Sequence, residues 1–181
     1  MPHPTPAQTV GPFYGYALPF PDGGRIAPAG HPGTVTVHGY VRDGQGDPVP
    51  DALLETWQAV PEALPGSLRR DPVSGGFPGR NGVDFTGFGR VATDADGHWA
   101  VWTQAPPGTA PYLAVCVFAR GLTHHLFTRA YLAPDAPDTL LASLSPDRRR
   151  TLIAREEQPR TYRFDIRLQG EKETVFLDFH R

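Results

Sequence analysis

The sequence contains little that would support disulfide, membrane or nucleic-acid chemistry. Among its 181 residues there is one cysteine, Cys116, so no disulfide can form within the chain. No run approaches the roughly 18 apolar residues that cross a bilayer, and the first residues lack the charged and apolar regions of a signal peptide. The formal net charge of −2 gives no electrostatic case for nucleic acid or an anionic membrane as partner. These absences predict a soluble cytoplasmic protein.

Recognisable catalytic and metal-binding motifs are also missing. There is no glycine-rich phosphate loop, no nucleophile elbow around a serine and no zinc-ligand spacing. Of the seven histidines only His124 and His125 are adjacent, and neighbouring side chains on a strand point to opposite faces. We therefore expect one of them in the core and one on the surface. Cys116 lies in an apolar run and is expected to be a small buried side chain.

The residues that are present predict an all-β protein. Twenty glycines and 21 prolines are spread along the chain, which is typical of short strands separated by turns. Strands are predicted at 34–42, 52–58, 88–93, 98–103, 112–118, 126–132, 162–168 and 174–179. Without βαβ spacing, this pattern favours a β-sandwich of antiparallel or mixed strands over residues 34–181. Residues 1–33 form an irregular arm, whose large apolar residues predict packing on another surface.

Turns and helices can be placed more locally. Residues 94–97, with the sequence DADG, give the clearest hairpin signal and predict that the strands on either side pair with each other. Residues 138–144 have the length for two helical turns. The sequence Ser145-Pro146-Asp147 combines an N-cap, a proline at the first helical position and an acidic first turn, which predicts a second short helix.

Arg120 is the most informative polar residue for function. It follows the apolar strand predicted at 112–118 and precedes a glycine, so a guanidinium stands where a strand meets a loop. The fork of an arginine matches a carboxylate, which suits this position to binding an acidic ligand. A salt bridge at the edge of a sheet explains the same position equally well. The residues alone leave both alternatives open.

Four segments, taken in order, resemble the intradiol ring-cleavage dioxygenases. They are residues 5–13 (TPAQTVGPF), 54–59 (LETWQA), 84–97 (DFTGFGRVATDADG) and 127–132 (FTRAYL). Together they span nearly the whole chain in the order found in that family. The resemblance implies a β-sandwich and cleavage of an aromatic ring by O2 at a ferric ion, which two tyrosines and two histidines hold.

The iron ligands of that family are not found here. The positions of its two histidines fall on Tyr112 and Ala114, and no tyrosine occurs between Trp57 and Phe85 or within 106–110. Alanine cannot donate to Fe(III), and a lone tyrosine would not hold it. The resemblance therefore implies a chain without a metal site or catalytic residues of its own. Whether Tyr112 has another role stays open.

Other segments are similar to the family's non-catalytic alpha chains, which pair with a homologous, iron-binding beta chain. These segments are residues 110–115 (APYLAV), 118–121 (FARG) and 162–179. The resemblance implies a hetero-oligomer with the substrate pocket at the interface, Fe(III) on the beta chain, and protocatechuate opened by O2 to 3-carboxy-cis,cis-muconate. It also implies that Thr9, Gly11, Pro12 and Arg120 face this pocket, and that Arg120 lies near the substrate carboxylate.

Two other interpretations compete with this one. A β-sandwich binding module with no enzymatic role explains the strands and the missing ligands, but it does not explain the ordered motifs. A self-sufficient catechol dioxygenase would need iron ligands that the sequence lacks. Only the interpretation as a non-catalytic alpha chain requires a homologous partner that carries those ligands, so co-purification of such a partner would distinguish it from the other two.

Overall fold

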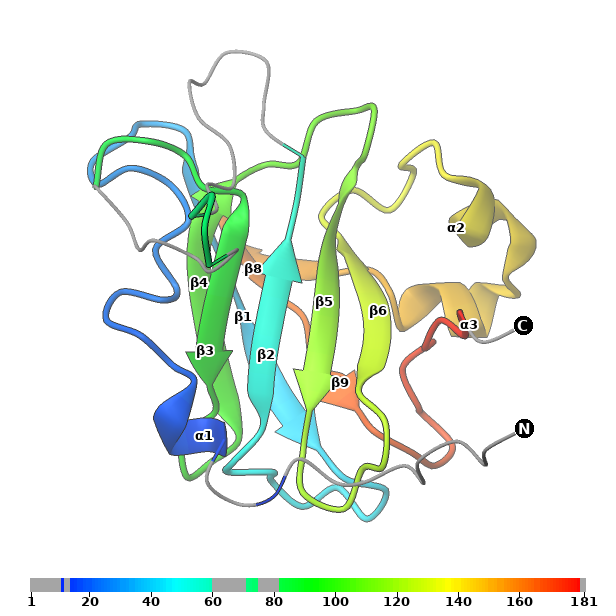
Figure 1. Ribbon diagram of the computed structural model, residues 1–181. Helices are drawn as coiled ribbons and strands as arrows, with labels where there is room; N and C mark the ends of the chain where they lie inside the picture. Colours follow the sequence, from blue (N-terminus) through cyan, green and yellow to red (C-terminus); the bar gives the residue numbers. More distant parts are fainter. Residues whose placement is uncertain (1–10, 12–13, 60–70, 75–81, 180–181) are drawn as a thin grey trace, which may run out of the picture.

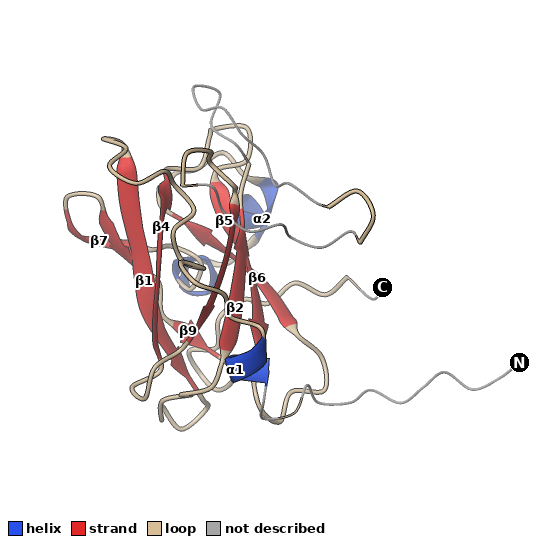
Figure 2. Cartoon of the chain, turned by 60° about the vertical axis from the view of Figure 1, so that its left-hand side comes forward, coloured by secondary structure: helices blue, strands red, loops and turns tan. Residues whose placement is uncertain are grey.

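Two β-sheets packed face to face make up the protein (Figure 1). The structure is a computed structural model that describes residue 11 and residues 14–59, 71–74 and 82–179. One sheet has the strand order β4-β1-β8-β7, with β9 also paired to β1, and the other has the order β3-β2-β5-β6. Figure 2 shows the two layers, with β1 and β7 on one side and β2 and β6 on the other. The predicted β-sandwich is confirmed.

The strands begin and end close to the predicted positions. Their bounds are β1 Thr34–Arg42, β2 Leu53–Trp57, β3 Phe88–Ala92, β4 His98–Gln104, β5 Tyr112–Phe118, β6 Leu126–Tyr131, β7 Arg155–Gln158, β8 Thr161–Arg163 and β9 Ile166–Arg167. Short helices lie at α1 Tyr14–Ala17, α2 Thr139–Ser143 and α3 Pro146–Arg150. Most neighbouring strands are antiparallel, whereas β1 runs parallel to β8 and β9.

The main core fills the space between the two sheets. Every second residue of β1 is buried, including Val37 and Val41, and the same alternation buries Leu113, Val115 and Val117 of β5. This follows from the strand period of two, which sends successive side chains to opposite faces. The inward-facing apolar residues of the two sheets therefore share one interior.

A second, smaller core lies beside α2 and includes Tyr131, Leu141, Leu152 and Val175. Asp138 begins α2 as its N-cap, because its side chain accepts a hydrogen bond from the backbone N–H of Leu140 at 2.8 Å. The second predicted helix forms as α3, with its proline in the first turn. Both predicted helices are therefore confirmed. In the part of the chain that the structure describes, no helix is long and apolar enough to cross a bilayer.

The predicted hairpin at residues 94–97 is wrong in its pairing. A tight turn does form, since Gly97 donates to the carbonyl of Asp94 at 2.9 Å and has a φ of +77°. However, β3 pairs with β2 and β4 pairs with β1, so the turn joins two different sheets. A turn sequence fixes only the local reversal of the chain, whereas the pairing partner depends on contacts from elsewhere.

The last two predicted strands are also different in the structure. The strand at 162–168 is interrupted between β8 and β9, where the backbone N–H of Tyr40 donates to the side chain of Asp165 at 3.1 Å. The register with β1 is the same before and after this break. Residues 174–179 are not a strand, because their backbone hydrogen bonds go to separate segments at Thr151, Arg167 and Phe127.

The predicted burial of His124, His125 and Cys116 can also be checked. His124 and His125 are both exposed, so the prediction of one core histidine is wrong. They lie in the loop between β5 and β6, where the alternation of a strand does not apply. Cys116 is buried as predicted, and this burial raises the pKa of its thiol to about 12.

Part of the N-terminal arm packs against the sandwich. Arg90 of β3 donates its backbone N–H to the carbonyl of Gly23 at 3.0 Å and its side chain to the carbonyl of Leu18 at 3.2 Å. A Cβ atom at Gly23 would lie 2.1 Å from the Arg90 carbonyl, so this close approach requires glycine. In contrast, the side chains of Tyr16 and Leu18 are 85% and 45% exposed. Val10 and Phe13 lie outside the described residues.

Candidate functional site

The positions that correspond to the family's histidine ligands lie at the start of β5. In this chain, the positively charged side chain of an arginine lies in that region. The guanidinium of Arg129 lies 4.0 Å from the centre of the Tyr112 ring. Arg129 also makes an ion pair with Asp138 at 3.1 Å and donates to the Tyr131 hydroxyl at 3.4 Å. Ala114 faces Arg129 directly across the β5–β6 ladder. Tyr112 therefore supports an arginine, an interaction that the sequence did not reveal.

The residues in this region do not fit a ferric site. Ala114 has no donor atom, and the Arg129 guanidinium already lies over the Tyr112 ring and donates to the Tyr131 hydroxyl, so a fixed positive charge stands beside both phenols. Among the described residues, no group of three or more His, Cys, Asp or Glu side chains could hold a metal ion.

Arg120 lies at the opposite end of β5, in the loop that leads to β6. Its side chain is 62% exposed, and its Nε atom lies 2.5 Å from Oδ2 of Asp51, whose side chain is 20% exposed. The salt bridge that was the other explanation for the position of Arg120 is therefore present. The contact with a substrate carboxylate remains a prediction, and the exposed guanidinium is accessible to one.

The N-terminal arm reaches this same end of the sandwich. Tyr14 of α1 is buried, and its hydroxyl donates to the carbonyl of Phe118 at 3.3 Å, two residues before Arg120. The pKa of Tyr14 is raised to about 12, first by burial and then by the nearby charge of Asp51. Its hydroxyl therefore stays protonated and acts as a hydrogen-bond donor.

Of the four predicted pocket residues, the structure describes Gly11 and Arg120, whereas Thr9 and Pro12 lie outside the described residues. Gly11 has a φ of +80°, a backbone conformation that favours glycine, and it precedes Tyr14 by three residues. The hydrogen bond from Tyr14 joins the arm to the end of β5 at Phe118, two residues before Arg120. The sequence analysis did not identify Tyr14 or Asp51. Nothing in the local sequence of either residue indicates that it contacts a segment so distant along the chain.

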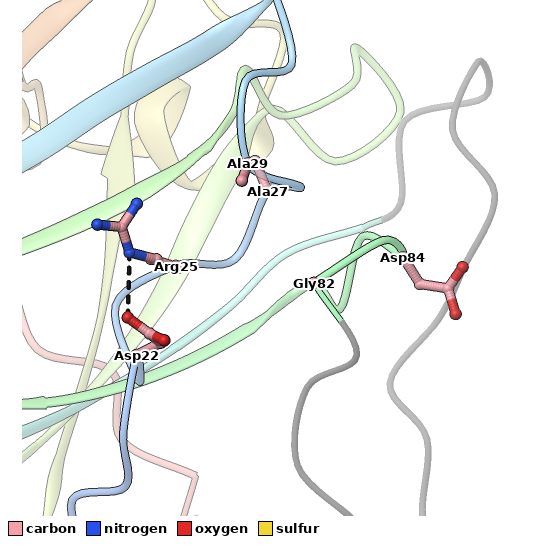
Figure 3. A pocket seen from close by; sticks show the side chains of 6 residues that line it. All are labelled: Asp22, Arg25, Ala27, Ala29, Gly82 and Asp84. Atoms are coloured by element: carbon pink, nitrogen blue, oxygen red, sulfur yellow. Dashed lines mark hydrogen bonds and ion pairs between the residues drawn. The ribbon is translucent and has the colours of Figure 1, made fainter.

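Open hollows also occur elsewhere on the surface. One of about 390 Å³ is lined by Asp22, Arg25, Ala27, Ala29, Gly82 and Asp84 (Figure 3). Its Arg25 and Asp22 form an ion pair with each other at 3.1 Å. None of these lining residues belongs to the group around Arg120.

Comparison with known proteins identifies relatives along nearly the entire chain, although no family model matches. The protocatechuate 3,4-dioxygenase alpha chain of Burkholderia cepacia is 37% identical over 198 aligned residues, which cover 96% of each chain. The alpha chain of the same enzyme from Pseudomonas putida is 34% identical and covers 97% of this chain and 96% of the relative.

A solved structure agrees with these relatives in fold. The dioxygenase domain of a dioxygenase carbohydrate-binding protein fusion from Streptomyces sp. SirexAA-E is 28% identical, with a TM-score of 0.55, over 93% of this chain and 99% of that domain. The similarity to this enzyme domain and to the two alpha chains favours the dioxygenase interpretation over a binding module without enzymatic role. The chain belongs to the protocatechuate 3,4-dioxygenase alpha chains, within the intradiol ring-cleavage dioxygenases.

Proposed function

We propose that this chain is the subunit without iron of an enzyme that cleaves protocatechuate. In the assembled enzyme, O2 is added across the ring bond between the two hydroxyl-bearing carbons, which gives 3-carboxy-cis,cis-muconate. The observation that carries the proposal is the similarity to protocatechuate 3,4-dioxygenase alpha chains over 96% of the chain. Tyr112 and Ala114, which stand at the family's histidine positions, support a role without iron for this chain.

The partner in this proposal is a homologous beta chain. The intradiol dioxygenases depend on non-haem iron, and we place Fe(III) on the beta chain because Tyr112 and Ala114 stand at the histidine positions here. When bound there, the ion supplies the site at which the catechol hydroxyls bind and O2 reacts. The exposed Tyr16 and Leu18 belong to the part of the arm that is available to cover the partner.

The contribution of this chain is the shape and charge of the shared pocket. Thr9, Gly11 and Pro12 would form part of its wall, and Arg120 would face the substrate carboxylate. The hydrogen bond from Tyr14 to Phe118 supports this arrangement, since it ties the arm to the loop of Arg120. A positive guanidinium near a carboxylate favours protocatechuate over catechol, which has no carboxylate.

Co-expression with the beta chain tests the proposal. Native mass spectrometry should show this chain only in hetero-oligomers that contain iron, and ring cleavage should require both chains. Ferric tyrosinate absorbs visible light, so the complex should be coloured and this chain alone colourless. Stoichiometric iron with a visible band in the chain alone, or full activity of the beta chain without it, would contradict the proposal.

A further inference from the structure

The Arg120–Asp51 ion pair is asymmetric. The Asp51 side chain is 20% exposed and that of Arg120 is 62% exposed, so the carboxylate is the more enclosed partner. An exposed arginine samples many rotamers, and ordering it costs conformational entropy. If a fixed carboxylate already holds the arginine, this conformational entropy is lost when the protein folds and not when a ligand binds.

The turn that carries Asp51 is fixed on both sides by Thr93. The Thr93 hydroxyl donates to the carbonyl of Val49 at 2.7 Å and accepts from the backbone N–H of Ala52 at 2.9 Å. The backbone N–H of Thr93 also donates to the carbonyl of Ala52 at 2.9 Å, and the residue is buried. Asp51 thus stands between two anchored residues at the entry to β2.

Helix α1 packs beside Asp51 and the end of β5 from another side. A Cβ atom on Gly15 would lie 3.7 Å from the Asp51 carbonyl, which is ordinary van der Waals contact. The neighbouring Tyr14 bonds to the carbonyl of Phe118 and lies close enough to Asp51 and Arg120 for both to affect its pKa. Three segments that are far apart in sequence, at the arm, the β1–β2 turn and the β5–β6 loop, therefore meet around Arg120.

We propose that Asp51 is a positioning residue, which holds the Arg120 guanidinium in the orientation that receives the substrate carboxylate. The inference rests on the proposed function. A guanidinium carries five N–H donors, and a carboxylate engages at most two of them in a fork, so binding Asp51 leaves donors for a second carboxylate. Asp51 acts only through Arg120 and touches neither the substrate nor the reacting carbons.

The test measures steady-state kinetics of the assembled enzyme with protocatechuate and with catechol. Asp51→Asn keeps the shape of the side chain and removes its charge. We expect kcat/KM for protocatechuate to fall about two- to five-fold, as for loss of one exposed ion pair, mainly through KM. The value for catechol should not change. Asp51→Glu keeps the charge on a longer stem and should recover part of the loss.

Non-additivity separates positioning from a structural role. In a background of Arg120→Ala, the Asp51→Asn change should have no further effect on protocatechuate, because the side chain it positions is gone. Glu157→Gln is the control, since it removes a carboxylate in the other sheet that pairs with the exposed Arg155 at 2.6 Å and also with His38 and Arg163. Native mass and iron content are measured for every variant.

Each outcome decides the matter. An equal loss for both substrates, additive effects in the double variant, or an unchanged or higher kcat/KM for protocatechuate in Asp51→Asn would overturn the role of Asp51. If Arg120→Ala selectively lowers protocatechuate turnover while Asp51→Asn does not, only this inference fails. If Arg120→Ala itself shows no selectivity for the carboxylate, the proposed role of Arg120 fails.

Discussion

The two ends of β5 each carry an arginine paired with an aspartate, but their surroundings differ. Near Tyr112, the Arg129 side chain is 26% exposed and its partner Asp138 is 10% exposed. A tyrosine ring and a second tyrosine hydroxyl complete its contacts. At the other end, the Arg120 side chain is 62% exposed beside Asp51.

This difference separates a structural cation from one that can bind a ligand. Only 26% of the Arg129 side chain is exposed, and the Tyr112 ring, Asp138 and the Tyr131 hydroxyl enclose it, so a new anion has little room to approach. Arg120 can accept a carboxylate with little rearrangement. The end of β5 where the family's histidines would lie is therefore closed by the chain's own side chains, whereas the end next to the arm is open.

The largest effect should come from Arg120→Ala in the assembled enzyme. Losing one charge-assisted contact to the substrate typically costs about 1.5–3 kcal/mol, so kcat/KM for protocatechuate should fall roughly ten- to a hundred-fold. The value for catechol should fall less, and iron content and assembly should stay the same. Arg155→Ala removes another exposed, ion-paired arginine and is the matched control. Equal losses for both substrates would remove the carboxylate role.

Arg129→Ala should damage stability rather than kinetics. It leaves Asp138 largely enclosed without its cation, and we expect the free energy of unfolding to fall by about 2 kcal/mol. Thermal unfolding should shift to lower temperature, while kcat/KM of the folded enzyme stays within about two-fold. Arg150→Ala is the control, because its ion pair with Asp147 is fully on the surface. A selective kinetic defect in Arg129→Ala would show that the two ends of β5 are not separate.

Asp138→Asn should have a smaller effect than Arg129→Ala. The amide still accepts the hydrogen bond from Leu140 and can cap α2, so only the charge pairing with Arg129 is lost. We expect a destabilisation of about 1 kcal/mol or less, measured by thermal unfolding. Asp138→Ala, which removes the cap as well, should cost more. If the Asn and Ala variants are equally destabilised, the cap contributes nothing.

The ends of β5 also show what sequence reasoning could and could not find. The bounds of β1 and β5 were predicted correctly, because alternation of apolar residues follows from burying one face of a strand. The missing ligands at Tyr112 and Ala114 could be located by resemblance. The Arg129 side chain that lies in their place could not be predicted. Arg129 contacts Tyr112 only because β5 and β6 pair in one particular register.

The errors have the same origin. The turn at 94–97 was recognised, but its strands belong to different sheets, because sheet membership depends on partners such as β1 and β2. Asp51 had no signal in the sequence, although it lies 2.5 Å from a predicted site residue. Local chemistry was therefore predictable, and pairing between distant segments required the structure.

One further effect is absent at neutral pH and should appear only at high pH, where the two ends should behave alike. Burial raises the pKa of Tyr131, near Arg129, and of Tyr14, near Arg120, to about 12. In the unfolded chain a tyrosine releases its proton near pH 10, so between about pH 10 and 12 the folded state holds protons that the unfolded state has lost. The stability that these two phenols contribute is therefore complete below about pH 10 and is lost as the pH rises through about 12.

Phenylalanine variants isolate these contributions. Tyr131→Phe and Tyr14→Phe should each reduce the fall in thermal stability between about pH 10 and 12, and the double variant should reduce it further, because the two sites share no contacts. Tyr16→Phe, at an exposed side chain, is the control and should leave the pH dependence as it is. The measurement is the unfolding temperature of the assembled enzyme at several alkaline pH values. If both single variants retain the full pH dependence, burial of these hydroxyls does not set it; if only one variant retains it, the two ends of β5 differ in their electrostatics as well as in their exposure.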